Sequence, residues 1–166
     1  MVPVSTVFGA PTAEVSDNGY LYTLSDGNLA ADGVTTFSGD GTEVGGANEM
    51  FDNDNSTYAG KQNTTGAGGP IGYITVDILR KISDAVVNAH FSAYGLEAGS
   101  SHTATLQSST DNSTWTDLVN VGQTGGGETF KNYGGQITLR YIRLKCAFGG
   151  TNVSAGRFYS LRVSKK

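Results

Sequence analysis

The sequence contains little cysteine and proline and no long apolar run, and these shortages exclude several classes of protein. Cys146 is the only cysteine among 166 residues, so the chain can form neither a disulfide framework nor a cysteine-based zinc site. No run of 18 apolar residues occurs, which excludes a transmembrane helix. Residues 1–20 lack the basic start and apolar core of a secretory signal, so we expect none. The 24 glycines come with three prolines and no fixed period, unlike collagen.

Charge of one sign is missing from each end of the sequence. The chain carries 11 basic and 15 acidic side chains, for a net charge of −4. Residues 1–60 contain nine acids and no lysine or arginine, whereas residues 129–166 contain eight bases and no acid. Most of these bases lie in predicted strands rather than in a tail. We therefore expect part of the split to be balanced within the fold, and the remainder to mark surfaces of salt-sensitive association.

What the sequence does contain is typical of an all-β domain. Glycine, threonine, serine and asparagine are abundant, and they disfavour helices. Short β-prone segments lie between clusters of Gly, Asn and Asp, which indicates a sandwich or a barrel. The predicted strands cover 20–24, 34–37, 71–79, 86–94, a hairpin over 102–122 with its turn at 111–112, 136–146 and 157–163. Loops are predicted over 47–60, 61–70 and 148–156, and no linker or repeat divides the chain, so we expect one domain over 1–166.

The strand over 136–146 changes face part of the way along. Ile142, Leu144 and Cys146 share one face, but Ile137 and Leu139 have the opposite parity. Because side chains alternate strictly along a strand, the change of parity predicts a β-bulge near residue 140.

Five segments between residues 47 and 163 resemble, in order, motifs of the discoidin-type (coagulation factor type C), galactose-binding-like family. They are the acidic loop MFDNDNSTYAGK, the strand GPIGYITVDIL, the hairpin TATLQSSTDNSTWTDLVNV, and the closing strands RYIRLKC and GRFYSLRV. Residues 1–46 show no clear match beyond an expected opening strand or two. The resemblance implies an all-β fold, a β-sandwich of jelly-roll type, used as a binding module for glycans, lipid head groups or proteins.

The acidic loop offers oxygen ligands for a metal. Asp52, Asp54 and Thr57 lie close together with backbone carbonyls between them, a donor set that suits calcium. The resemblance implies a structural calcium here, completed by a glutamate from the final strand, but this sequence has Ser160 at the matching position. The alternative is a tight turn capped by Asp and Asn side chains, and both interpretations stay open.

The resemblance also implies that ligand-binding loops lie at one end of the sandwich. Planar amides, arginine and aromatic rings are the side chains that suit sugar hydroxyls. The candidate ligand-binding residues, chosen for chemistry and loop placement, are Tyr58, Lys61, Gln62, Asn63, Tyr94, Phe148, Asn152 and Arg157.

Other conspicuous side chains receive structural roles. Trp115, the only tryptophan, matches a position that the family buries, so we expect it in the core. Tyr141, Arg143 and Lys145 form a cationic outer face, which we expect to be solvated or to contact protein. Nucleic acid is not expected there, because the chain is acidic overall.

Function follows less directly from these residues. His90 and His102 come without a G-x-S-x-G or H-E-x-x-H motif, so we predict a protein that is not an enzyme. The main hypothesis is a structural or attachment subunit of a virion, such as a bacteriophage tail or capsid decoration protein. It would assemble in the host cytoplasm with other virion subunits or with itself. The alternative is an extracellular carbohydrate-binding module of a larger or secreted bacterial protein. Either could bind a cell-surface glycan, and neither is expected to insert into a membrane.

Overall fold

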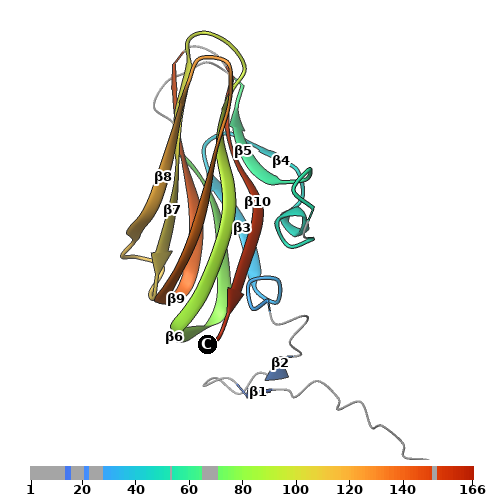
Figure 1. Cartoon of the computed structure of the whole chain (residues 1–166), viewed down its shortest axis with the longest axis vertical. Coiled ribbons are helices and arrows are strands. Elements are labelled where there is room, and N and C mark those ends of the chain that lie inside the picture. The colour runs from blue at the N-terminus through green and yellow to red at the C-terminus, as the bar shows by residue number, and fades with distance from the viewer. Residues whose placement is uncertain (1–13, 16–20, 23–27, 53, 65–70, 151–152) are drawn as a thin grey trace, which may run out of the picture.

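The computed structural model describes residues 28–52, 54–64, 71–150 and 153–166, together with the backbone of two short strands nearer the N-terminus. Antiparallel strands make up most of it, as predicted (Figure 1). The elements are β1 Glu14–Val15, β2 Leu21–Tyr22, β3 Val34–Gly39, β4 Thr42–Val44, the 3-10 turn η1 Ala47–Met50, β5 Ala59–Asn63, β6 Ile71–Gly95, β7 Ser100–Ser109, β8 Thr116–Thr124, β9 Gly127–Gly150 and β10 Ser154–Ser164. No described helix is long and apolar enough to cross a membrane.

Two long strands, β6 and β9, pair with each other and form the spine of the fold. Their register runs from Ile71 with Ala147 to Gly95 with Gly127. It shifts on both sides of the pair formed by Ile82 and Leu139, where β6 contains extra residues. Two non-glycine residues of this stretch, Leu79 and Asp84, have positive φ angles of 65° and 57°, which mark a sharp corner. The corner divides each strand into two halves.

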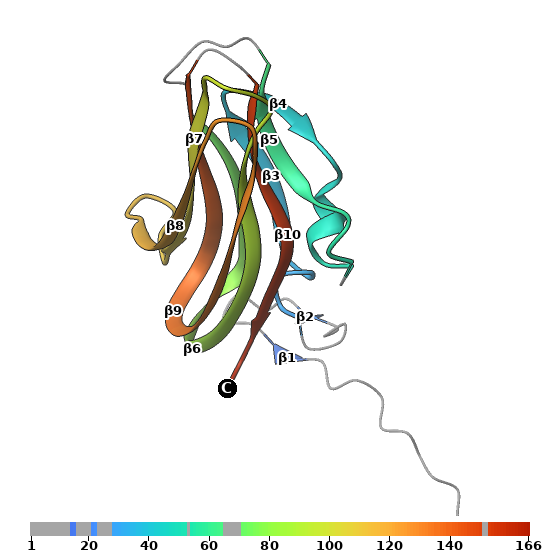
Figure 2. The same cartoon turned by 45° about the horizontal axis from the view of Figure 1, so that its top comes forward.

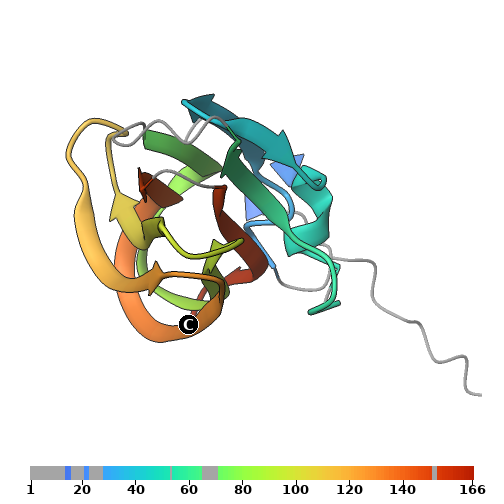
Figure 3. The same ribbon diagram turned by 90° about the horizontal axis from the view of Figure 1, so that it is seen from above.

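Each half of the spine belongs to a different layer. In the first, which we call the β10 layer, the order is β4, β5, β10, β6 and β9. In the second, the β7 layer, β3 pairs with the first half of β6, and β9 continues to β7 and β8. Figure 2 and Figure 3 show the two layers curving around a common interior. The two outer faces of the sandwich therefore point away from each other.

The core lies between the layers and comes from strict alternation along the strands. The largest fully buried side chains are Phe91, Phe158, Met50, Ile74, Leu106, Leu139, Ile142, Leu144, Leu161, Val76, Val87 and Val163. Burying each such side chain contributes roughly 1.5–3 kcal/mol, so the core dominates the stability of the fold. The predicted apolar faces of the 71–79 and 136–146 segments are thereby confirmed.

Several predicted boundaries were wrong. The segments 71–79 and 86–94 belong to one strand, β6, rather than two. The predicted loops 61–70 and 148–156 are shorter, because β5 extends to Asn63, β9 to Gly150 and β10 begins at Ser154. Their glycines look like loop residues in the sequence, yet a glycine backbone pairs in a ladder as any other does.

Two further expectations concern the bulge and the N-terminal strands. The irregularity near Arg140 is confirmed, but the inserted residues lie on β6, opposite Leu139, because β6 carries the outer bend of the corner. Val34–Gly39 confirms the strand predicted over 34–37, whereas only Leu21–Tyr22 of the strand predicted over 20–24 lies within the described residues.

Candidate functional site

The outer face of the β10 layer holds an arginine between two aromatic rings. The Arg157 guanidinium lies 3.9 Å from the ring centre of Tyr94 and 4.5 Å from that of Tyr58. The three residues come from β10, from β6 and from the segment just before β5, so their meeting depends on the pairing of β10 with both neighbours. Cation–π contacts of this kind contribute about 0.5–2 kcal/mol each and fix the plane of the guanidinium.

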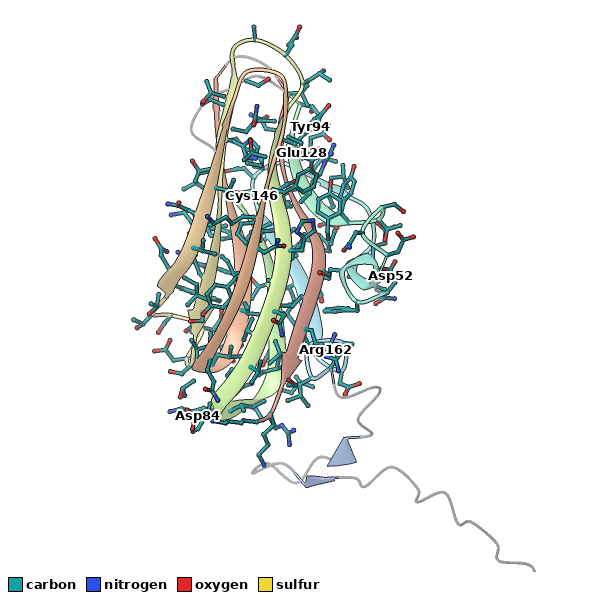
Figure 4. All side chains as sticks on the ribbon, viewed as in Figure 1. Asp52, Asp84, Tyr94, Glu128, Cys146 and Arg162 are labelled. Atoms are coloured by element: carbon teal, nitrogen blue, oxygen red, sulfur yellow. The ribbon has the colours of Figure 1, made fainter. Side chains whose placement is uncertain are left out.

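Glu128 joins this cluster to β9 and neutralises its charge. Its carboxylate accepts hydrogen bonds from Arg157 Nη1 at 3.1 Å, from the Tyr159 hydroxyl at 2.7 Å and from the Ser92 hydroxyl. Tyr94 and Glu128 are paired residues of β6 and β9 and lie together in Figure 4. Burial lowers the pKa of Arg157, but Tyr159 and the negative charge of Glu128 raise it more, so the net shift is upward. Arg157 is therefore paired with a carboxylate through Nη1, while its buried Nε has no hydrogen-bond partner among the residues that the structure describes.

An aromatic patch continues along the same face. Phe130 has 50% of its surface exposed and stacks parallel on the imidazole of His90, with ring centres 5.3 Å apart and planes at 3°. Tyr159 lies 5.5 Å from both rings, because a β-bulge between Phe158 and Ser160 gives β10 one extra residue there. A half-exposed phenylalanine held in a fixed orientation provides a flat apolar surface to solvent.

A groove of about 340 Å³ runs beside this patch. Strands β6, β9 and β10 and the turn η1 contribute its lining, and Arg162 marks its lower part in Figure 4. The polar lining residues are Asn88, His90, Asn132, Tyr133, Ser160 and Arg162. The volume falls within the range of small-ligand sites, about 300–1,000 Å³. Amides, hydroxyls and an arginine beside aromatic rings are groups that can hydrogen-bond sugar hydroxyls and stack on a sugar ring.

His102 lies inside the sandwich, behind this face. It is 4% exposed, and its Nε2 accepts a hydrogen bond from the backbone N–H of Tyr94 at 3.1 Å. Its buried Nδ1 has no hydrogen-bond partner among the residues that the structure describes. Burial, aided by the charge of Arg157, lowers the pKa of His102 to about 4, so the ring is neutral at pH 7. The histidine links the two layers and does not face the groove.

Three of the predicted ligand-binding residues come together and others do not. Tyr58, in the loop before β5, meets Tyr94 of β6 and Arg157 of β10 in the cluster described above. Lys61 is 3% exposed and donates to the carbonyl of Gly41, while Phe148 is 3% exposed in the interior. Asn63 is also buried, Gln62 is half-buried on β5, and Asn152 lies outside the described residues. Loop placement is confirmed for Tyr58 but was wrong for the other described candidates, because β5, β6, β9 and β10 extend further than the composition indicates.

Sequence reasoning missed the residues that complete the face. Glu128, Phe130 and Asn132 alternate on β9, and Ser92 and His90 alternate opposite them on β6. The signal was available in part, because Glu128 is the last acid of the sequence. The strand over 127–137, however, is mostly glycine and polar residues, so its alternation carries no apolar pattern.

The acidic loop forms a network of internal hydrogen bonds. Asp52 accepts from the backbone N–H of Asp54 and from the Thr57 hydroxyl, each at 2.8 Å, and Asp54 accepts twice from Ser56. These bonds lower the pKa of the Asp54 carboxyl. No group of three or more His, Cys, Asp or Glu side chains suited to a metal occurs among the described residues. The contacts are those of a capped turn, and calcium at Asp52, Asp54 and Thr57 stays a prediction from the sequence.

Trp115 is not a core residue, contrary to expectation. It is half-buried on the outer face of the β7 layer, with the guanidinium of Arg143 3.7 Å from its ring centre. Trp115 directly precedes β8, which begins opposite Ser108, and this position turns the indole towards the outer strand face. Tyr141 and Lys145 lie on the same outer face, as predicted.

Comparison with known proteins identifies the fold of this chain. Neither a family model nor a curated protein matches the chain. Three solved structures align with TM-scores of 0.50: a GH29 fucosidase mutant from Ruminococcus gnavus in complex with fucose, a chitosan-binding module of a chitosanase/glucanase from Paenibacillus, and CBM32-1 from a family 31 glycoside hydrolase of Clostridium perfringens. Their identities are 19%, 21% and 16%, over 84%, 82% and 83% of this chain.

The shares of the other chains differ. The alignment spans 26% of the fucosidase chain, but 96% of the chitosan-binding module and 97% of CBM32-1. The alignment thus spans nearly all of each binding module and about a quarter of the fucosidase chain. It has the discoidin-like, galactose-binding-like β-sandwich fold that such carbohydrate-binding modules have.

Proposed function

We propose that this protein is a non-catalytic carbohydrate-binding module that works outside the cell and holds neutral glycans on the outer face of the β10 layer. The observation that carries the proposal is the half-exposed Phe130 stacked on His90, at the edge of the polar groove. The fold supports the proposal, since the modules named above share it. Fold alone does not assign a function, so the site has to carry the argument.

The proposed site combines an apolar surface with a polar one. Phe130 offers an apolar plane for the face of a sugar ring, while Asn88, Asn132 and Arg162 offer amide and guanidinium groups for its hydroxyls. The ion pair of Arg157 and Glu128 beside this site joins β10 to β9 across the sheet. A shallow, open groove of this kind implies weak binding, with a Kd in roughly the micromolar to millimolar range, near −4 to −8 kcal/mol.

The proposal is tested by calorimetric titration with neutral oligosaccharides of fucose, galactose and N-acetylglucosamine. We expect at least one of them to bind, and Phe130→Ala to weaken it at least about tenfold, or 1.4 kcal/mol. Val34→Ala is the matched control, because Val34 is also 50% exposed but lies on β3 of the other layer. Failure of every neutral glycan, or equal effects of the two substitutions, would contradict the proposal.

The virion hypothesis receives no support from the solved structures, whereas its alternative, the carbohydrate-binding module, shares their fold. Assembly with virion subunits or with itself remains a prediction from the sequence alone. Mass spectrometry of purified virus particles tests this hypothesis, and absence of the chain from such particles would contradict it.

A further inference from the structure

The outer face of the β7 layer carries a second arginine between aromatic rings. The Arg143 guanidinium lies 3.7 Å from the ring centre of Trp115 and 4.3 Å from that of Tyr73. Tyr73 belongs to β6 and Trp115 directly precedes β8, so the rings come from either side of the β9 strand that carries Arg143. Contacts to both rings fix the plane of the guanidinium and cover its faces. Its N–H groups, at the edge of that plane, can still donate hydrogen bonds to a ligand.

One hydrogen bond holds the orientation of Arg143 without neutralising its charge. Its Nε donates to Gln107 Oε1 at 2.7 Å, and the Gln107 amide donates in turn to Asp117. Asp117, Gln107 and Arg143 are consecutive partners across β8, β7 and β9. Since the amide of Gln107 is turned by Asp117, its oxygen faces the arginine. Apart from this bond, Arg143 makes no hydrogen bond or ion pair with any residue that the structure describes.

The surroundings of Arg143 favour an anion. Lys145 follows two residues later on the same face, between Thr105 and Tyr73 in the register. Burial lowers the pKa of Arg143, only partly offset by Tyr73 and by the charge of Asp117, so its positive charge is not fully compensated. A guanidinium with fixed orientation and a free edge matches a carboxylate, which it can bind through two parallel hydrogen bonds.

We propose that Arg143, held between Tyr73 and Trp115, binds a carboxylate group of an acidic polysaccharide on the face opposite the neutral-glycan groove. The indole and phenol rings provide apolar surface for the sugar that carries the carboxylate, and Lys145 attracts the next one along the polymer. The choice of a saccharide as the carrier rests on the proposed function. The carboxylate site itself does not, because it shares no residue with the groove.

Trp115 is the only tryptophan, so its fluorescence reports on this site directly. The probe is an oligomer of galacturonic acid, and the matched control ligand is the same oligomer with methyl-esterified carboxyl groups. We expect the acid to change Trp115 emission in a saturable way that weakens with added salt, and the ester to leave it unchanged. A wild-type protein that shows neither an emission change nor heat with the acid would overturn the proposal.

Substitutions separate a specific site from general attraction. Arg143→Gln is expected to bind the acid at least about tenfold more weakly, and Lys81→Gln, which removes one exposed charge at the β6 corner, to bind as wild type. Arg143→Lys keeps the charge but loses the planar fork, and should also bind weakly. Equal behaviour of Arg143→Gln and Lys81→Gln, or wild-type affinity in Arg143→Lys, would contradict the site. Far-UV circular dichroism and urea unfolding confirm that each variant is folded.

A second copy of the chain is the other possible source of carboxylates, because residues 1–60 are acidic. Sedimentation velocity without saccharide separates the two sources. We expect Arg143→Gln to leave the sedimentation coefficient unchanged, whatever the oligomeric state of the wild type. If the wild type is a dimer that dissociates in this variant, the carboxylate belongs to the partner copy and the proposal is overturned. Loss of neutral-glycan binding alone would affect only the groove, so the two proposals fail separately.

Discussion

Arg157 and Arg143 lie on opposite faces of the sandwich, each beside two aromatic rings, and they differ in their polar partners. Each guanidinium lies between two aromatic rings at 3.7–4.5 Å. Arg157 meets a carboxylate directly, in Glu128, whereas Arg143 meets the neutral amide of Gln107, which separates it from Asp117. An arginine between aromatic rings therefore has two roles here. Arg157 forms an ion pair that joins two strands, and Arg143, which has no ion-pair partner among the described residues, is available to a ligand.

The pKa shifts of the two arginines agree with this difference. Burial lowers the pKa of both, but only at Arg157 do neighbouring groups reverse the shift and raise it. The side chains of Arg157 and Glu128 are 15% and 19% exposed, so water screens their attraction weakly. Arg143 is half-buried like Arg157, so the difference between the two arginines lies in their neighbours.

The largest expected difference is in stability. Arg157→Met leaves the Glu128 carboxylate without its cation in a largely buried place, which we expect to lower the free energy of unfolding by about 3–4 kcal/mol. Arg143→Met leaves no carboxylate unpaired and should cost about 1 kcal/mol, mainly lost packing on the rings. Urea unfolding at neutral pH measures both. Similar losses for the two variants would mean that the two clusters have the same structural role.

The second prediction concerns pH and the interior behind Arg157. The pKa of His102 is about 4 in the folded chain and about 6.5 when unfolded, so between these values the unfolded chain binds more protons. Stability should therefore fall as the pH drops from about 6.5 towards 4, by about 2–3 kcal/mol. In His102→Gln, whose amide oxygen can accept from Tyr94, this part of the pH dependence should disappear. An unchanged profile in the variant would place the titrating group elsewhere.

How much the sequence predicts differs between the two faces for a physical reason. Apolar alternation identified the strands of the β7 layer, and the hairpin turn is confirmed by the bonds of Asp111 to Ser113 and Thr114. On the β10 layer, Arg157, Tyr58 and Tyr94 were candidates, but Glu128 and Phe130 were not. Both lie in the polar, glycine-rich part of β9. The register of this strand is set by pairing with β6, which lies far from it in the sequence.

The position of Trp115 also could not be predicted from the local sequence. A lone tryptophan resembles a core residue in the sequence, since apolar area favours burial. Its actual position depends on Arg143, 28 residues later, and on the pairing of β7 with both β8 and β9. A cation–π contact between distant strands leaves no local pattern.

A smaller effect is expected when the support of Arg143 is removed. Gln107→Leu fills a similar volume but cannot hold Nε, so the guanidinium loses its fixed orientation. We expect stability to change by less than about 1 kcal/mol, because Asp117 is exposed and can be solvated. Galacturonate binding should weaken about two- to fivefold, measured by Trp115 emission. An unchanged affinity would show that the amide does not orient the arginine.

The smallest effect is expected from calcium. The carboxylates of Asp52 and Asp54 already accept hydrogen bonds from their own loop, so calcium should raise the Tm no more than magnesium does at equal ionic strength. Differential scanning calorimetry with each ion and with a chelator measures this. A selective rise with calcium, abolished by Asp52→Asn, would establish the metal site predicted from the sequence.

The central claim is that two faces of one sandwich bind different ligands, and one crossed titration tests it most directly. Phe130→Ala and Arg143→Gln are each titrated calorimetrically with the neutral oligosaccharide that binds the wild type and with oligogalacturonate. We predict that Phe130→Ala loses the neutral ligand and keeps the acid, and that Arg143→Gln does the reverse. Loss of both ligands in one variant, or of neither ligand in both variants, would contradict the account.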